Sequence, residues 1–165
     1  MTDAKGPADA GHDGSTVVTS DGATITAFED FCNRRCARIN ACVVATDASV
    51  DGGASCVSTC DASESTFTQY RGDYWTAVAS CFEGSSCASI LNGQASSACA
   101  TTAQNSLTPS ATIVSFCTGS ACPPEDQIQD CQTALAPYTD AKVTALSSCI
   151  TTMGCAMTAT CAMAL

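Results

Sequence analysis

The sequence predicts an all-α fold of disulfide-rich short helices and helical hairpins in two tandem related units, with a short β-hairpin in the N-terminal tail. Three observations favour it. The 165 residues contain 14 cysteines, an even number, several at helical spacing. Leu, Ile, Val and Phe together number only 25, too few for an ordinary core. A tyrosine–cysteine motif occurs twice with one spacing: Tyr70-x10-Cys81-x5-Cys87 and Tyr138-x10-Cys149-x5-Cys155.

The cysteines are interpreted as structural disulfides. Burial of so little apolar surface offsets chain entropy poorly, whereas disulfides stabilise by about 2–4 kcal/mol each. Neither Cys-x-x-Cys nor Cys-x-Cys occurs and His12 is the only histidine, so we expect no metal and no cofactor. Stable disulfides predict a secreted, periplasmic or cell-surface protein. The sequence has no hydrophobic signal stretch, so we expect that an export signal has been removed.

Residues 1–26 are predicted to form a polar tether that ends in a hairpin. Asp21-Gly22 lies between two runs rich in β-branched residues, which is a strong hairpin signal. An extended tail is one alternative. In another, a strand containing Val17, Val18 and Ile25 pairs with a neighbouring molecule.

The first stapled unit is expected over residues 27–103. The capping box Thr26-x-x-Glu29 predicts a helix start. One face of this helix should be buried and contains Phe28, Cys32, Cys36, Ile39 and Val43. On its opposite side, Asp30 and Arg34 can form an i,i+4 pair.

A second, antiparallel helix should begin near Cys56-x3-Cys60, after the break at residues 51–53. Cysteines four residues apart lie on the same face of a helix. Two such pairs, one on each of two antiparallel helices, can therefore form two disulfides between the helices. We predict the disulfides Cys42–Cys56 and Cys36–Cys60.

Further along the chain, helix caps predict the remaining helices. Asp73 should cap a helix that buries Trp75, Val78, Ala79 and Phe82, and Ser85 or Ser86 should cap a turn ending near Gly93. The second stapled unit covers residues 104–165, with helix starts near Pro124 and at Thr139 or Asp140. Its predicted disulfide is Cys122–Cys131. Partners stay open for the other cysteines: Cys32, Cys81, Cys87, Cys99, Cys117, Cys149, Cys155 and Cys161.

No catalytic constellation is evident. His12 lies in the tail, so nucleophilic catalysis has no histidine base, and we expect a protein that is not an enzyme. The net charge of -10 argues against nucleic acid as a partner. Arg34, Arg35 and Arg38 form the main positive cluster, which is either a solvated helix face or a surface for an acidic partner. Arg71-Gly72-Asp73 matches an adhesion tripeptide, but Asp73 is better explained as a helix cap.

The tether Ala-Asp-Ala-Gly-His-Asp-Gly, followed by Phe-Cys-x3-Cys-x5-Cys and later Ser-Cys-x5-Cys units, resembles cysteine-rich exported lipoproteins of myxobacterial type. The resemblance implies surface or periplasmic placement and carries no reaction. Those proteins begin at a lipidated cysteine, which this sequence lacks, so contact with a membrane is expected only through a lost lipid anchor.

The expected function is therefore an exported, non-enzymatic, disulfide-stapled helical binding or structural module, displayed at or beyond the cell envelope. Its partner would be a protein, an envelope component or another copy of the chain. One alternative is a carrier of a small apolar ligand. The scarcity of Leu, Ile and Val argues against it, because they would have to line both a cavity and a core. The other alternative is a self-assembling extracellular subunit that uses the N-terminal strand.

Overall fold

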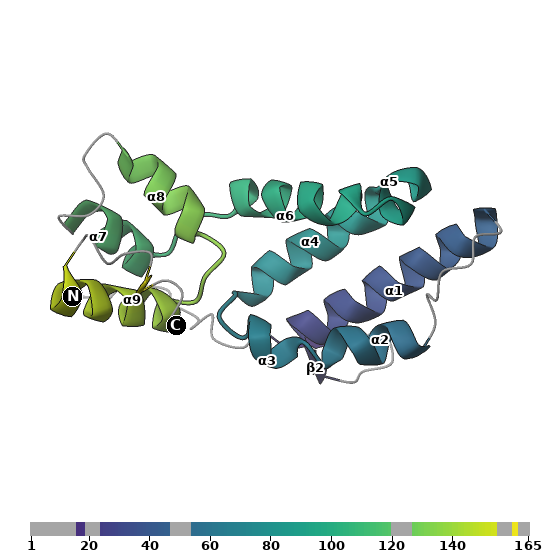
Figure 1. The fold of residues 1–165 in the computed structure, drawn as a ribbon, viewed down its shortest axis with the longest axis horizontal. Helices are drawn as coiled ribbons and strands as arrows, with labels where there is room; N and C mark the ends of the chain where they lie inside the picture. Colours follow the sequence, from purple (N-terminus) through teal and green to yellow (C-terminus); the bar gives the residue numbers. More distant parts are fainter. Residues whose placement is uncertain (1–15, 19–23, 47–53, 120–126, 155–159, 162–165) are drawn as a thin grey trace, which may run out of the picture.

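The computed structural model describes residues 16–18, 24–46, 54–119, 127–154 and 160–161. The all-α, disulfide-rich prediction is confirmed. The helices form two groups along an elongated molecule, with α7–α9 at one end and α1–α6 at the other (Figure 1). The helices are α1 Ala27–Thr46, α2 Ala54–Asp61, α3 Glu64–Phe67, α4 Gly72–Gly84, α5 Cys87–Leu91, α6 Gln94–Ser106, α7 Ala111–Gly119, α8 Ile128–Leu135 and α9 Asp140–Met153.

The predicted hairpin is present. Strands β1 (Thr16–Val18) and β2 (Thr24–Thr26) pair antiparallel, with Val17 opposite Ile25. Asp21 and Gly22 lie outside the described residues. At the end of β2 the hydroxyl of Thr26 accepts a hydrogen bond from the Glu29 amide at 3.1 Å, so the predicted cap starts α1.

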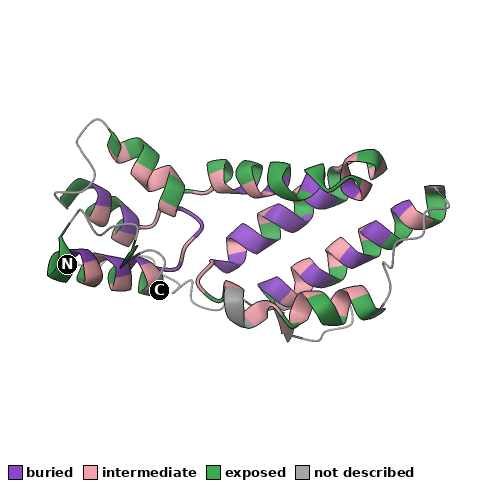
Figure 2. Ribbon diagram, in the orientation of Figure 1, coloured by how far each residue is buried: buried purple, intermediate pink, exposed green. Residues whose placement is uncertain are grey.

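Helices α1 and α4 form the centre of the first group. The predicted face of α1 is buried through Phe28, Cys32, Cys36 and Ile39, whereas Val43 is only half-buried. The four residues predicted to point inward from α4 are all buried. Figure 2 shows these buried positions as stripes along both helices. On the other side of α1, Asp30 and Arg34 form the predicted pair at 3.4 Å.

Helix α6 was not predicted, because its buried residues are small. It buries Ala95, Cys99 and Ala103 at four-residue spacing, a helical period without large apolar side chains. Gly93, at φ 80°, turns the chain into it from α5. The predicted cap at the start of α5 is confirmed, since the Ser86 hydroxyl accepts a hydrogen bond from the Ser89 amide at 3.2 Å.

The second group packs α7 and α8 with α9. Ile113, Cys117 and Val143 form a small buried cluster, and Leu146 and Ile150 extend it along α9. The start of α9 is as predicted, because the Thr139 hydroxyl accepts a hydrogen bond from the Lys142 amide at 3.3 Å. Pro124 lies outside the described residues.

All twelve described cysteines are paired. The predicted disulfides Cys36–Cys60, Cys42–Cys56 and Cys122–Cys131 are wrong. Cys131 binds Cys117, and Cys122 and Cys155 lie outside the described residues. The bonds are Cys32–Cys60, Cys36–Cys56, Cys42–Cys87, Cys81–Cys99, Cys117–Cys131 and Cys149–Cys161.

The error is one of register between α1 and α2. These helices are antiparallel as expected, but α2 lies one turn nearer the start of α1 than predicted, so that Cys60 meets Cys32 and Cys56 meets Cys36. Cys42 is then left beyond the reach of α2 and bonds to Cys87 at the start of α5. Helix α1 is therefore cross-linked to two other helices, α2 and α5, and its disulfides do not all lie within one hairpin.

A buried arginine connects the two helix groups. Arg71 is 6% exposed, and its Nη1 donates hydrogen bonds to the carbonyls of Thr108 at 2.9 Å and Ala136 at 3.2 Å. Its Nε donates to the Asp73 carboxylate at 3.0 Å, so Asp73 does not cap α4 as predicted. The Arg71 amide donates to the Pro137 carbonyl at 2.8 Å. In the adhesion-like tripeptide, the side chains of Arg71 and Asp73 are therefore engaged in contacts within the protein.

Matching segments of the two groups meet at this connection. Tyr70 and Tyr138, the tyrosines of the repeated motif, form an antiparallel bridge, and the Thr139 amide donates to the Gln69 carbonyl at 2.9 Å. The tyrosine rings stack with centroids 4.9 Å apart. Equivalent residues of the two motifs therefore pair with each other. This pairing supports the internal repeat, which stays a prediction.

Disulfide mapping of the unreduced protein should show Cys32–Cys60 and Cys36–Cys56. Trypsin, which cleaves after arginine, separates Cys32, Cys36 and Cys42 through cuts at Arg34, Arg35 and Arg38. Thermolysin cleavage before Val57 separates Cys56 from Cys60. A linked peptide pair joining Cys36 to Cys60 would contradict the register described here.

Arg71→Ala should lower the free energy of unfolding by about 3 kcal/mol, because it leaves the buried Ala136 carbonyl, the Thr108 carbonyl and the Asp73 carboxylate without this donor. Arg71→Lys should recover part of the loss, since it keeps the charge but not the planar fork. Arg34→Ala, which removes a more exposed ion pair, is the control and should cost at most about 1 kcal/mol. Urea unfolding with the disulfides intact measures all three, and equal small losses for both alanine variants would refute the role given to Arg71.

Candidate ligand-binding cleft

An aromatic cleft of about 700 Å³ lies within the first helix group, between α1, α2, α4 and α6. Four of the five phenylalanines of the chain and its only tryptophan line it. The aromatic lining residues are Phe28, Phe31, Phe67, Tyr74, Trp75 and Phe82.

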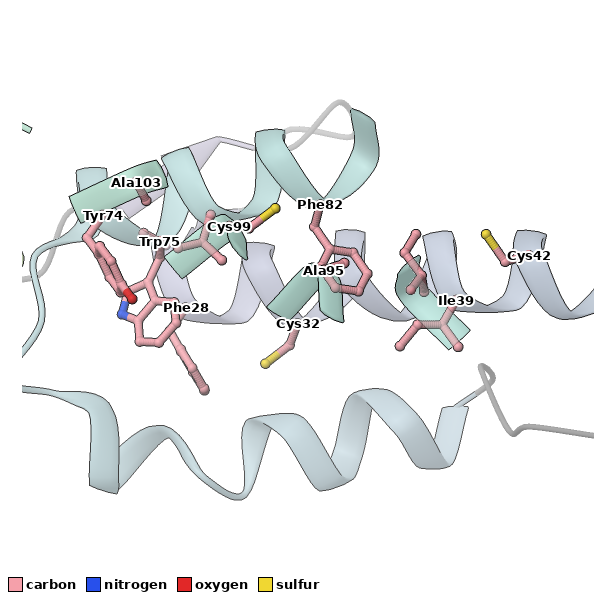
Figure 3. Packing of buried hydrophobic residues seen from close by; sticks show 13 residues of the cluster. Phe28, Cys32, Ile39, Cys42, Tyr74, Trp75, Phe82, Ala95, Cys99 and Ala103 are labelled. Atoms are coloured by element: carbon pink, nitrogen blue, oxygen red, sulfur yellow. The ribbon is translucent and has the colours of Figure 1, made fainter. Parts of the chain in front are cut away.

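The aromatic side chains pack around Trp75. Its ring lies 4.8 Å from that of Phe28 in an edge-on arrangement and 5.0 Å from that of Phe31, centroid to centroid. Phe67 of α3 contacts the same indole edge-on at 5.5 Å. Figure 3 shows Tyr74, Trp75 and Phe28 together at one end of the row of buried side chains, with Phe82 and then Ile39 farther along. Such pairs favour a fixed geometry beyond simple burial.

The cleft stays open because its other walls carry small side chains. Helix α2 contributes Ser55 and Thr59, and α6 contributes Ser96 and Ala100. None of the described side chains of α2 is fully buried, as the absence of purple on α2 in Figure 2 shows. Helix α2 is instead bonded to α1 by two disulfides, which fix it beside a space that its own residues do not fill.

The predicted arginine surface is largely used inside the molecule. Arg34 of α1 donates to Glu83 of α4 at 2.6 Å, and Arg38 donates to the Ser85 carbonyl at 2.8 Å. The hydrogen bond with Glu83 raises the pKa of Arg34, and the same contact lowers the pKa of Glu83. Arg35 differs, because it lines the cleft and lies over the ring of Phe82 with 5.9 Å to the centroid. The three side chains therefore do not act as one surface.

All three tyrosines of the chain stack at the tryptophan end of the cleft. Tyr70 lies between Tyr74 and Tyr138, with ring centroids 5.3 Å and 4.9 Å apart. Burial, then a hydrogen bond with Tyr70, raises the pKa of Tyr138 to about 12. Burial also raises the pKa of Tyr74.

Among the described residues, the lining of the cleft includes no carboxylate and no histidine, and both lining cysteines, Cys56 and Cys60, are in disulfides. No cluster of metal-ligating side chains occurs within the described ranges. Within the same ranges, none of the helices combines the length and apolar character needed to span a bilayer.

Sequence reasoning did not find the cleft. Of the aromatic residues that line the cleft, the sequence predicts burial on a helix face for Phe28, Trp75 and Phe82, and all three are buried. The available signal was the contrast between aromatic residues on α1 and α4 and Ser, Thr or Ala on the facing helices. Comparison of the chain with protein-family models, with curated proteins and with solved structures found no match.

An alkaline titration should show that Tyr138 ionises late. The folded-state pKa of Tyr138, about 12, lies above the unfolded value of about 10. The stability from this proton is therefore fully present below pH about 10 and is lost as the pH rises to about 12. Ultraviolet absorbance of tyrosinate after rapid pH jumps should show a last step near pH 12, which Tyr138→Phe removes. Ionisation of all three tyrosines near pH 10 would contradict the buried stack.

Proposed function

We propose that the protein is an exported, non-enzymatic binding module that carries a small apolar ligand in the aromatic cleft. The observation that carries the proposal is an open cleft of about 700 Å³ lined by most of the aromatic residues of the chain. This volume lies within the range of small-molecule sites, about 300–1,000 Å³.

The scarcity of Leu, Ile and Val in the sequence argued against a ligand carrier. The aromatic rings remove this objection, because each ring buries a large apolar area and a few rings can both form the core and line the cleft. Trp75 and Phe82 are almost fully buried yet border the cleft. A ligand would add apolar contacts mainly to Phe31 and Phe67, the two lining rings that are only half-buried.

The disulfides support a role outside the reducing cytosol. Six bonds among the described residues are typical of proteins in oxidising compartments. Two of them hold the α2 wall of the cleft, so ligand binding would depend on oxidation. The described lining residues include serine and threonine hydroxyls but no carboxylate or histidine to activate them, which supports a carrier rather than an enzyme.

Titration of the oxidised protein with 1-decanol should quench or shift the fluorescence of Trp75, the only tryptophan, with an affinity of roughly micromolar order. Ala100→Phe, which fills the cleft from α6, should weaken binding at least about tenfold. Ala98→Phe makes the same change at an exposed position of the same helix and should leave binding unchanged. Equal effects of the two variants, or no binding by the intact oxidised protein, would refute the proposal.

A further inference from the structure

We propose that the cleft selects amphipathic carboxylates, with the apolar body among the aromatic rings and the carboxylate bound by Arg35. The inference rests on the proposed function and names its ligand class. Arg35 is the only charged residue among the described residues that line the cleft. It lies on α1 beside Phe31 and Phe82, so one ligand can contact both the charge and the rings.

Arg35 has no ionic partner within the described part of the protein. The other described arginines all donate hydrogen bonds: Arg34 to Glu83, Arg38 to a carbonyl, and Arg71 to Asp73 and two carbonyls. The guanidinium of Arg35 instead contacts a ring face, which positions the group without using its N–H donors. Its donors are therefore available to an anion in the cleft.

The chemistry of this group favours a carboxylate. Guanidinium presents paired N–H donors in a plane that matches the two carboxylate oxygens. Arg35 is half-buried beside apolar rings, where a charge-assisted hydrogen bond is stronger than in open water. The chain carries a net charge of -10, so most of the surface repels a ligand anion, whereas the guanidinium of Arg35 attracts it.

The test compares two ligands of equal chain length, decanoate and 1-decanol, on the oxidised protein at neutral pH, below the concentration at which either aggregates. Arg35→Gln should weaken decanoate roughly five- to tenfold and change 1-decanol less than about twofold. Arg35→Lys should restore part of the decanoate affinity. Lys142→Gln removes one positive charge on α9, in the other helix group, and should leave both affinities unchanged.

The outcomes separate this inference from the proposed function. If Arg35→Gln leaves both affinities unchanged, or lowers both equally, carboxylate recognition is overturned and the apolar carrier stands. If Lys142→Gln weakens decanoate as much as Arg35→Gln does, the effect belongs to net charge and the inference is likewise overturned. If the correctly bridged protein binds neither ligand, the proposed function fails, and this inference fails with it.

Discussion

The two disulfides between α1 and α2 are the constraint on which the rest of the structure depends. Helix α2 buries none of its described side chains fully, so hydrophobic packing contributes little to its position. Cys32–Cys60 and Cys36–Cys56 fix it in one antiparallel register instead. A helix that is held covalently does not have to fill the space beneath it. This is how a chain with few large aliphatic residues can keep an apolar cleft open without collapsing into it.

The connection between the two helix groups also relies on directional contacts instead of apolar area. Arg71 joins them through carbonyls of Thr108 and Ala136, and the Tyr70–Tyr138 bridge adds a pair of stacked rings. A buried guanidinium is stable only when its donors are satisfied, so the orientation of the second group is specified by hydrogen-bond geometry. Tyr70 also contacts Trp75 edge-on, so the connection between the two helix groups adjoins the tryptophan end of the cleft.

Local features of the fold could be predicted from the sequence, and features that depend on distant contacts could not. The caps at Thr26, Ser86 and Thr139 follow from short-range hydrogen bonds, and all three are present. Cysteines at helical spacing are compatible with several registers one turn apart, so the sequence predicted antiparallel helices but the wrong partners. The sequence around Asp73 predicts a helix cap. In the structure Asp73 instead binds Arg71, which is buried and contacts Ala136, 65 residues farther along the chain. The cleft was missed because it depends on which residues face the aromatic side chains, and the register of α2 and the packing of α6 decide that.

We expect that α2 is held by its two disulfides to α1, whereas α4 is held by packing together with Cys81–Cys99, which bonds it to α6. Hydrogen exchange measured by mass spectrometry tests this directly on a variant in which Cys32, Cys36, Cys56 and Cys60 are all replaced by serine. The amides of α2 should lose their protection, while those of α4, which packs closely on α1 and α6, should keep most of theirs. Protection of α2 equal to that in the intact protein would contradict the account, because α2 would then be held by packing and the cleft would not depend on the disulfides.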